Sequence, residues 1–215
     1  MSEKNLAERI IEMGVVAIMR AKSSDQLLEA ADALLAGGVT AIEVTMTTPG
    51  ALDIVRRARD KYGPEVLFGV GSVLDAETAR AAILAGAEFV VGPTLNLKTI
   101  EICKRYSVPV IPGAYTPTEI LTAWEAGADA VKVFPASVGG PAYIKAVKAP
   151  LPQIRVAAVG GVNLDTAQDF IRSGTDILGV GSALVNQKLL DARDFATISE
   201  RARRFREEVK KGRGE

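Results

Sequence analysis

Short apolar runs alternate with longer amphipathic stretches along the whole chain. Most runs are continuously apolar rather than alternating, which is typical of parallel strands covered on both faces. The pattern predicts eight strands: Val15–Met19, Ala41–Val44, Val66–Val70, Phe89–Val91, Val108–Ile111, Ala130–Val133, Val156–Val159 and Ile177–Val180. The intervening stretches carry helix start signals. Thr116-Pro117-Thr118-Glu119, for example, offers an N-cap, a proline in the first turn and a capping glutamate.

Eight successive strand-and-helix units without a break in composition predict an α/β protein with the (β/α)8, or TIM, barrel fold. We expect a single domain over residues 1–215, with an extra N-terminal helix over 1–14 and a frayed tail over 210–215. The chain length suits one such barrel. A doubly wound parallel sheet is the alternative fold.

An internal repeat favours the barrel. Four predicted helices end in a glycine-containing turn that leads directly into a strand, in the stretches AGGVTAIEV, AGAEFVVG, AGADAVKVF and SGTDILGVG. The glycines are Gly38, Gly86, Gly127 and Gly174, separated by 48, 41 and 47 residues. Each one supplies the positive-φ helix cap that a short connection requires. The even spacing corresponds to two strand-and-helix units per repeat.

The repeat aligns the strands and so predicts which positions are equivalent. Glu88, Asp129 and Asp176 follow their glycines by two residues, at the N-terminal ends of strands, where barrels carry stabilising rather than catalytic residues. We interpret these acids as solvated strand ends. The positions five residues after the four glycines are Glu43, Val91, Lys132 and Gly179. Because alternate strands of a barrel contribute to the same interior layer, Lys132 and Glu43 are expected to share one.

Composition removes many kinds of chemistry. The chain has no histidine and one cysteine, Cys103, which excludes histidine-based triads, His-ligated zinc, intrachain disulfides and CxxC redox pairs. Cys103 falls in a predicted helix, Leu97–Arg105, and is interpreted as a buried apolar residue. The formal net charge is zero, which gives no attraction to nucleic acid or an anionic membrane. No apolar stretch resembles a membrane span or a signal peptide, so we expect a reducing, cytoplasmic location.

A lysine and a glutamate inside strands require an explanation, because charged residues avoid such positions unless they are paired. Lys132 and Glu43 either form a structural ion pair or act as a Schiff-base lysine with a carboxylate that transfers protons. Burial lowers the pKa of a lysine and thereby makes its amine nucleophilic, whereas a nearby ionised glutamate opposes that change. The sequence leaves this balance open.

Two glycine-rich segments follow the last two predicted strands. They are Val159-Gly160-Gly161-Val162-Asn163 and Gly179-Val180-Gly181-Ser182, and barrels commonly bind phosphate with the loops at these positions. Gly69-Val70-Gly71-Ser72 lacks the third glycine of a dinucleotide-binding loop. Arg20 ends the first strand at the same face, where it either forms a surface salt bridge or binds a substrate carboxylate.

These residues resemble the 2-keto-3-deoxy-6-phosphogluconate (KDPG) aldolases, which are class I lyases with the (β/α)8 fold. The matching stretches run through almost the whole chain: GVVAIMRA, GGVTAIEVTMTTP, FGVGSVLD, GAEFVVGP, VIPGAYTPTE, VKVFPAS, GGPAYIKA, VGGVN and GVGSALV. The resemblance implies that Lys132 forms the Schiff base and that Glu43 transfers protons. It places the contacts to the pyruvate carboxylate on Arg20 and Ser72, with Pro93 and Phe134 lining the pocket. It places the phosphate contacts on Gly160, Gly161, Gly181 and Ser182.

The resemblance also implies a reaction and its partners. KDPG is cleaved to pyruvate and glyceraldehyde 3-phosphate, as in the Entner–Doudoroff pathway, without a cofactor or a metal. Members are typically homotrimers. We expect no nucleic-acid or membrane partner.

Three departures concern the substrate. Val159 stands where many KDPG aldolases have threonine, which is more similar to aldolases of the galactonate epimer (KDPGal). Thr47 replaces an arginine that some members carry, a role that Arg20 takes over, and Ser72 replaces a threonine. KDPGal and 4-hydroxy-2-oxoglutarate are therefore alternative substrates. A sugar-phosphate isomerase or epimerase, and a non-catalytic sensor of a phosphorylated ligand, are the alternative functions.

Overall fold

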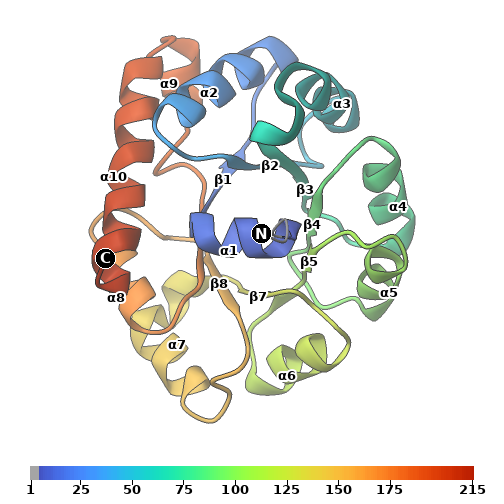
Figure 1. The fold of residues 1–215 in the computed structure, drawn as a ribbon, viewed down its shortest axis with the longest axis vertical. Helices are drawn as coiled ribbons and strands as arrows, with labels where there is room; N and C mark the ends of the chain where they lie inside the picture. Colours follow the sequence, from blue (N-terminus) through green and yellow to red (C-terminus); the bar gives the residue numbers. More distant parts are fainter. Residues whose placement is uncertain (1–4) are drawn as a thin grey trace.

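The computed structural model describes residues 5–215 as a nearly closed barrel of parallel strands surrounded by helices (Figure 1). The strands are β1 (Val15–Met19), β2 (Ala41–Thr45), β3 (Leu67–Gly71), β4 (Phe89–Val91), β5 (Val110–Ile111), β6 (Gly113–Ala114), β7 (Val131–Val133), β8 (Val156–Val159) and β9 (Ile177–Val180). All neighbouring strands pair in parallel. The predicted TIM-barrel class is confirmed, and the doubly wound alternative is wrong.

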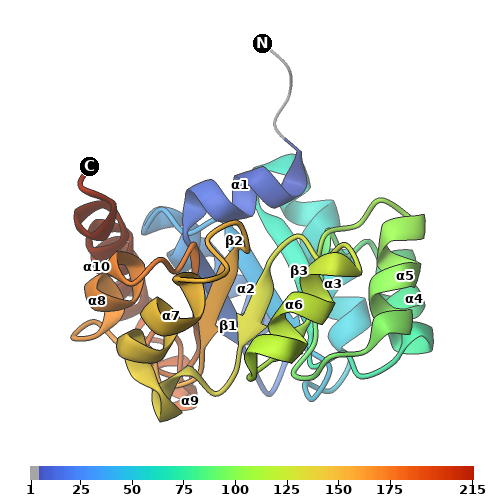
Figure 2. The same ribbon diagram turned by 90° about the horizontal axis from the view of Figure 1, so that it is seen from below.

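Helices alternate with the strands and form the outer layer (Figures 1 and 2). They are α1 (Leu6–Met13), α2 (Ser24–Ala36), α3 (Ala51–Tyr62), α4 (Ala76–Leu84), α5 (Leu97–Arg105), α6 (Pro117–Glu125), α7 (Gly140–Lys148), α8 (Ala167–Arg172), α9 (Gln187–Asp191) and α10 (Phe195–Arg213). Two 3-10 turns, Gly63–Glu65 and Ala136–Val138, complete the set. No helix in residues 5–215 combines the length and apolar character needed to cross a membrane.

The predicted N-terminal helix is present as α1, and its first predicted residues, 1–4, lie outside the described part of the chain. Figure 2 shows α1 lying across one end of the barrel. Its Asn5 N-cap and Glu8 form a capping box, which fixes where the helix begins. This end is the one at which the strands begin, because Gly14, the C-cap of α1, leads directly into β1.

The fifth predicted strand, Val108–Ile111, is wrong in its bounds. The structure divides this strand into β5 and β6, which are separated by Pro112 and form the two ends of the strand order β5-β4-β3-β2-β1-β9-β8-β7-β6. Pro109 and Pro112 have no N–H to donate to a ladder, so the strand starts late and breaks in the middle. The remaining predicted strands agree with the observed ones to within one residue at each end.

The helix ends follow the sequence signals. Gly38, Gly86, Gly127 and Gly174 all have φ between +82° and +98°, as the repeat predicts. The capping box of Thr116 and Glu119 is present at the start of α6. Helix α5 has the predicted bounds, and Cys103 is buried on its inner face.

Two apolar cores lie on opposite sides of the sheet. The larger core packs the helices against the outer faces of the strands. The smaller core fills the barrel interior with inward-facing residues and is closed by α1 through Ile10. Its members are Ile10, Val16, Ile18, Ala41, Leu67, Phe89, Val91, Ile111, Ala130, Ala157, Val159 and Ile177. The interior is therefore packed at the end where the strands begin.

The three acids at the strand starts are not the solvated groups that we predicted. Each carboxylate accepts a backbone N–H from the start of the neighbouring strand, and their side chains are only 11% to 28% exposed. Glu88 binds Phe68 N at 3.0 Å, Asp129 binds Val110 N at 2.9 Å and Asp176 binds Val156 N at 2.7 Å. They also pair with Arg59, Lys104 and Lys148 at 2.8, 3.1 and 3.9 Å, respectively. The prediction of solvated carboxylates is wrong because their hydrogen-bond and ion-pair partners lie on other strands and helices, which the local sequence does not show.

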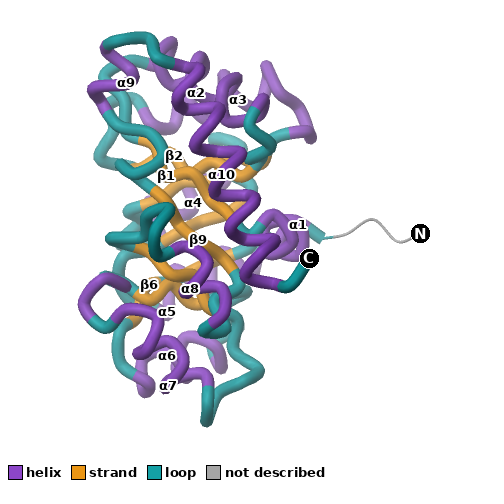
Figure 3. Tube along the Cα trace, turned by 90° about the vertical axis from the view of Figure 1, so that its left-hand side faces the viewer, coloured by secondary structure: helices purple, strands orange, loops and turns teal. Residues whose placement is uncertain are grey.

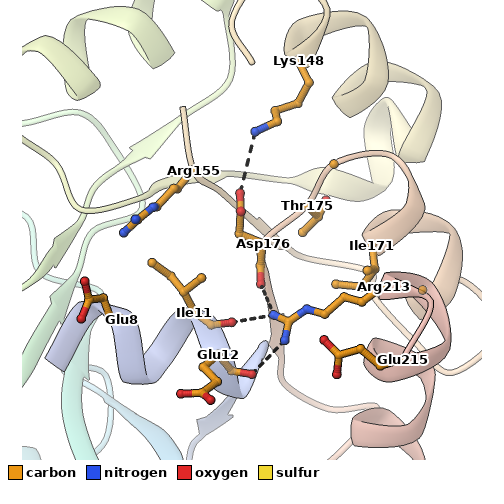
Figure 4. A pocket seen from close by; sticks show the side chains of 12 residues that line it. Glu8, Ile11, Glu12, Lys148, Arg155, Ile171, Thr175, Asp176, Arg213 and Glu215 are labelled. Atoms are coloured by element: carbon orange, nitrogen blue, oxygen red, sulfur yellow. Dashed lines mark hydrogen bonds and ion pairs between the residues drawn. The ribbon is translucent and has the colours of Figure 1, made fainter. Parts of the chain in front are cut away.

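The predicted frayed tail over residues 210–215 is also wrong. Helix α10 packs along α8 and α2 (Figure 3) and continues to Arg213. The Arg213 guanidinium donates to the backbone carbonyls of Ile11 at 2.6 Å, Glu12 at 2.9 Å and Asp176 at 3.3 Å (Figure 4). Arginine near the C-terminus of the helix thus satisfies carbonyl groups of α1, which orders the segment that a terminal position led us to expect as loose.

Candidate active site

A cavity of about 540 Å³ opens at the end of the barrel where the strands finish. All predicted site residues line it: Arg20, Glu43, Ser72, Pro93, Lys132, Phe134, Gly160, Gly161, Gly181 and Ser182. They come from β1, β2, β3, β4, β7, β8 and β9 or from the residues directly after them. The structure therefore brings together residues up to 162 positions apart in the sequence (Arg20 to Ser182).

Lys132 and Glu43 lie inside β7 and β2 and point into the barrel. Lys132 is 5% exposed and Glu43 is 3% exposed, yet both line the cavity. Gly179 also lines the cavity, and Val91 belongs to the apolar interior. The four positions predicted from the repeat thus all face inward, and the space beside Gly179 is filled by Val159 and Ile18.

The two charged groups are electrostatically coupled without forming an ion pair. Among residues 5–215, neither the Glu43 carboxylate nor the Lys132 amine makes a hydrogen bond or an ion pair within 4.0 Å. The alternative of a structural ion pair is therefore not what the structure contains. The Lys132 Nζ atom lies 5.0 Å from the centre of the Phe134 ring. Both groups remain available to a molecule in the cavity.

Burial shifts both groups toward their neutral forms. It raises the pKa of Glu43, although the positive charges of Lys132 and Arg20 oppose this shift. It lowers the pKa of Lys132; the Glu43 carboxylate opposes that change and the Arg20 charge adds to it. The sequence left open whether burial or the attraction between the two charges dominates. In the structure, burial has the larger effect on both pKa values. A buried amine with a lowered pKa is a candidate nucleophile.

Arg20 and Ser72 lie at the rim of the same cavity. Arg20 follows β1 and makes no hydrogen bond or ion pair within the described residues, so the surface salt bridge that was its alternative is absent there. Ser72 follows β3 with a φ of +59°, a conformation that non-glycine residues rarely adopt. An unpaired guanidinium and a hydroxyl at one rim are suited to a carboxylate.

The two glycine-rich loops present backbone donors to the cavity. Gly160 and Gly161 have φ of +92° and +81°, which turns the chain after β8. In the described chain, the N–H groups of Gly161, Val162, Ser182 and Ala183 donate to no protein acceptor. Unpaired backbone N–H groups in loops that line a cavity are suited to bind an anion.

Sequence reasoning missed several lining residues, of which Asn163 is the most informative. Its Oδ1 atom accepts the N–H groups of Asp165 at 2.9 Å and Thr166 at 3.1 Å, which fixes the side chain and leaves its NH₂ group without an acceptor among residues 5–215. Asn163 belongs to the VGGVN stretch, so its position carried a signal. Val162 and Ala183 contribute through backbone N–H groups, which any residue type has.

A second cavity, of about 770 Å³, lies at the opposite end of the barrel (Figure 4). Its charged residues are largely engaged in holding elements together: Arg213 binds α1 and β9, and Lys148 donates to the carbonyls of Pro152 and Ile154. The charged residues that line the larger cavity thus mainly stabilise the fold. Within residues 5–215, no group of three or more His, Cys, Asp or Glu residues is placed to hold a metal ion at either end.

Comparisons with known proteins find relatives over most of the chain. The model of the family "KDPG and KHG aldolase" matches residues 6–201. The chain is 33% identical to the 2-dehydro-3-deoxy-phosphogluconate aldolase of Haemophilus influenzae over 91% of this chain and 92% of that protein. It is 37% identical to the 2-dehydro-3-deoxy-6-phosphogalactonate aldolase of Escherichia coli over 80% of this chain and 85% of that protein.

Solved structures share the fold. A native KDPGal structure is 33% identical and has a TM-score of 0.87, with 94% of this chain and 96% of that chain covered. A KDPG aldolase from Legionella pneumophila, with pyruvate captured as a covalent carbinolamine, is 25% identical and also has a TM-score of 0.87, with 93% and 97% covered. The likeness extends over nearly the whole length of both chains.

Proposed function

The chain belongs to the KDPG and KHG aldolase family, which makes it an aldolase and thus a lyase, and from this premise we propose that it cleaves KDPG through a Schiff base on Lys132. The observation that carries the proposal is the buried Lys132 amine with its lowered pKa, unpaired and open to the same cavity as Glu43. An isomerase or a sensor has no need of a desolvated, unpaired lysine.

In the proposed reaction the neutral Lys132 Nζ attacks the C2 ketone of the substrate and forms a carbinolamine, which loses water to give an iminium. The Glu43 carboxylate then takes the proton of the C4 hydroxyl, and the C3–C4 bond breaks. Its electron pair moves into the iminium, which becomes an enamine, while glyceraldehyde 3-phosphate leaves. Glu43 returns a proton to C3 of the enamine, and hydrolysis releases pyruvate and free Lys132.

The two ends of the cavity suit the two ends of this substrate. We assign the pyruvate carboxylate to Arg20 and Ser72, and Pro93 and Phe134 line the three-carbon half. The phosphate is assigned to Gly160, Gly161, Gly181 and Ser182, with support from the free N–H groups of the two loops. These assignments need no cofactor or metal.

KDPGal is the second candidate substrate. Relatives of similar identity are aldolases of each epimer, and Val159, next to Gly160 in the cavity lining, matches the galactonate type in the resemblance described above. Comparison of kcat/KM for the two epimers, with 4-hydroxy-2-oxoglutarate as a third substrate, distinguishes the candidates. A preference of at least tenfold for the galactonate epimer would replace KDPG as our assignment.

Borohydride reduction in the presence of pyruvate tests the Schiff base. The reduced iminium leaves a three-carbon adduct on the peptide that contains VKVFP, which mass spectrometry locates. Lys132→Met is expected to lose both this adduct and substrate cleavage. An adduct on another lysine, or cleavage by the Met variant, contradicts the proposal.

We also propose a homotrimer in the cytoplasm. Support for self-association comes from large apolar side chains that are left exposed in the segments after β3 and β7, including Val138 at 71%, Leu74 at 58% and Phe134 at 40%. Light scattering coupled to size exclusion measures the state. A Val138→Glu variant is expected to weaken association, and a monomeric wild-type protein would contradict the trimer.

A further inference from the structure

Gly71, the last residue of β3, lies directly against the Glu43 side chain of the neighbouring strand. A Cβ atom added to Gly71 would lie 2.6 Å from Glu43 Cγ and closer still to Cδ and Oε1. These three atoms of Glu43 are the nearest neighbours that such a Cβ would meet. The carboxylate thus occupies the volume that any other residue at position 71 would fill.

No polar contact explains where the Glu43 carboxylate lies. Within residues 5–215 it makes no hydrogen bond or ion pair, and the charges of Lys132 and Arg20 act on it from a distance. A buried carboxylate held in this way owes its position to the shape of its surroundings. The absent side chain of Gly71 is the part of that shape in closest contact with it.

Two other strand glycines make room for apolar side chains instead, and Gly113 of β6 lies against the backbone of Pro93. Gly69, two residues earlier on β3, gives space to the Phe89 ring, and Gly179 gives space to Val159 and Ile18. The φ of Gly71 is not in the left-handed region, so its backbone conformation is open to alanine. The requirement for glycine at position 71 therefore comes from Glu43.

We propose that Gly71 is a positioning residue for Glu43, which sets the place and the freedom of its carboxylate. The catalytic part of this inference rests on the proposed function, in which Glu43 takes a proton from the C4 hydroxyl and later gives one to C3. Those two atoms are different, so one carboxylate must serve two places. A carboxylate that lies beside a glycine and is not tied by hydrogen bonds has room to do so.

Gly71→Ala tests the proposal. The added methyl displaces the carboxylate from β3 toward the open cavity, where water solvates it. Because burial is what raises the pKa of Glu43, the pKa should fall toward its ordinary value. Titration of the Glu43 carboxyl by ¹³C NMR measures this directly, and the acidic limb of the pH profile of kcat/KM should move to lower pH. We expect cleavage to fall by at least tenfold, with pyruvate still trapped on Lys132.

A compensating variant and a matched control sharpen the test. Glu43→Ala removes Cγ, Cδ and Oε1, the three atoms that the new methyl would meet. Addition of Gly71→Ala to Glu43→Ala should therefore lower the melting temperature much less than its addition to the wild type. Gly69→Ala, on the same strand, should lower the melting temperature through Phe89 without moving the Glu43 titration.

Two outcomes overturn the proposal. One is an unchanged Glu43 titration in a folded Gly71→Ala protein. The other is a Gly71→Ala/Glu43→Ala protein that is destabilised relative to Glu43→Ala by as much as Gly71→Ala is relative to the wild type, because glycine would then be needed for another reason. The NMR titration requires no turnover. A wild-type protein without aldolase activity would refute the proposed function and leave the positioning of Glu43 tested independently.

Discussion

The two ends of the barrel differ in whether their charged groups have partners in the protein. Where the strands begin, Glu88, Asp129 and Asp176 each bind a backbone N–H and a cation. Where the strands end, Lys132 and Glu43 are more deeply buried than these acids and have no hydrogen-bonded partner within the described chain. Both ends also contain a cavity, and the larger one lies at the end with the paired charges.

The difference separates charged groups that hold the fold together from charged groups that have no protein partner. An acid that satisfies a backbone donor and a cation stabilises the protein, because removing it leaves both uncompensated. An unpaired buried charge costs stability and persists where chemistry requires it. The larger cavity lies at the end whose charged groups are paired, so the pairing of these groups, and not cavity size, distinguishes the two ends as we interpret them.

A large loss of activity is expected from the removal of the base inside the cavity. Glu43→Gln keeps the size and polarity of the side chain but removes its ability to take a proton, so cleavage should fall by roughly 10²–10⁴-fold. The exchange of pyruvate methyl protons with deuterated solvent should fall in parallel, because enamine formation uses the same base. Some borohydride adduct should still form on Lys132. Cleavage at a near wild-type rate would leave Glu43 as a mere counter-ion of the lysine.

The phosphate end should respond through binding rather than chemistry. Gly161→Val fills space next to Ser137 and strains a left-handed backbone, and Ser182→Asp or Asn163→Asp places a negative charge beside the free N–H groups. Loss of one charge-assisted contact is worth about 1.5–3 kcal/mol, so KM for the phosphorylated substrate should rise by roughly 10- to 100-fold. Trapping of pyruvate is the control, and equal damage to both would place the phosphate elsewhere.

At the opposite end, mutation should change stability and spare activity. Asp129→Ala leaves the N–H of Val110 and the ammonium of Lys104 without their partner, which should lower the free energy of unfolding by about 1–3 kcal/mol. Asp53→Ala breaks an exposed pair with Arg56 and is the control, with an expected loss of at most about 0.5 kcal/mol. Urea denaturation measures both. A loss of kcat/KM in folded Asp129→Ala would contradict the prediction that this end of the barrel contributes to stability and not to activity.

Lys132→Met should be inactive and yet more stable than the wild type. Since burial lowers the pKa of Lys132, its protonation penalises the folded state, fully below the folded pKa and progressively less as pH rises toward the ordinary lysine value of about 10.4. The variant should therefore be more stable than the wild type near pH 7, and the gain should shrink toward pH 10. Thermal melts of both proteins between pH 7 and pH 10 measure this gain. A stability gain that grows with pH would contradict the prediction.

The smallest effect is expected from metal removal. Exhaustive dialysis against a chelator should leave kcat/KM unchanged, because the proposed reaction uses an amine, a carboxylate and backbone donors. The measurement is cleavage before and after dialysis, with and without added zinc or magnesium. Loss on chelation with recovery on addition of a metal would show metal-assisted chemistry.

The sequence predicts what depends on periodicity and local signals. The order of strands and helices, the four positive-φ glycines and the inward direction of Lys132 and Glu43 all follow from spacing, and the residues of the resembled family converge on one cavity. Features that depend on partners distant in the sequence could not be predicted. The N–H groups bound by Asp129 and its equivalents come from the preceding strand, and the carbonyls bound by Arg213 lie some 200 residues away. The contact between Gly71 and Glu43 likewise exists only once β2 and β3 are paired.

The strand order has a consequence for synthesis on the ribosome. The acid-to-backbone bonds at the strand starts span only 19 or 20 residues, so each can form soon after its second strand is made. Strand β1, in contrast, has β9 as its second neighbour, with Val15 facing Leu178, and β9 is translated last of all the strands. The apolar β1 therefore remains an open sheet edge until translation is nearly finished, and such an edge is the part of a nascent barrel most exposed to pairing with another chain.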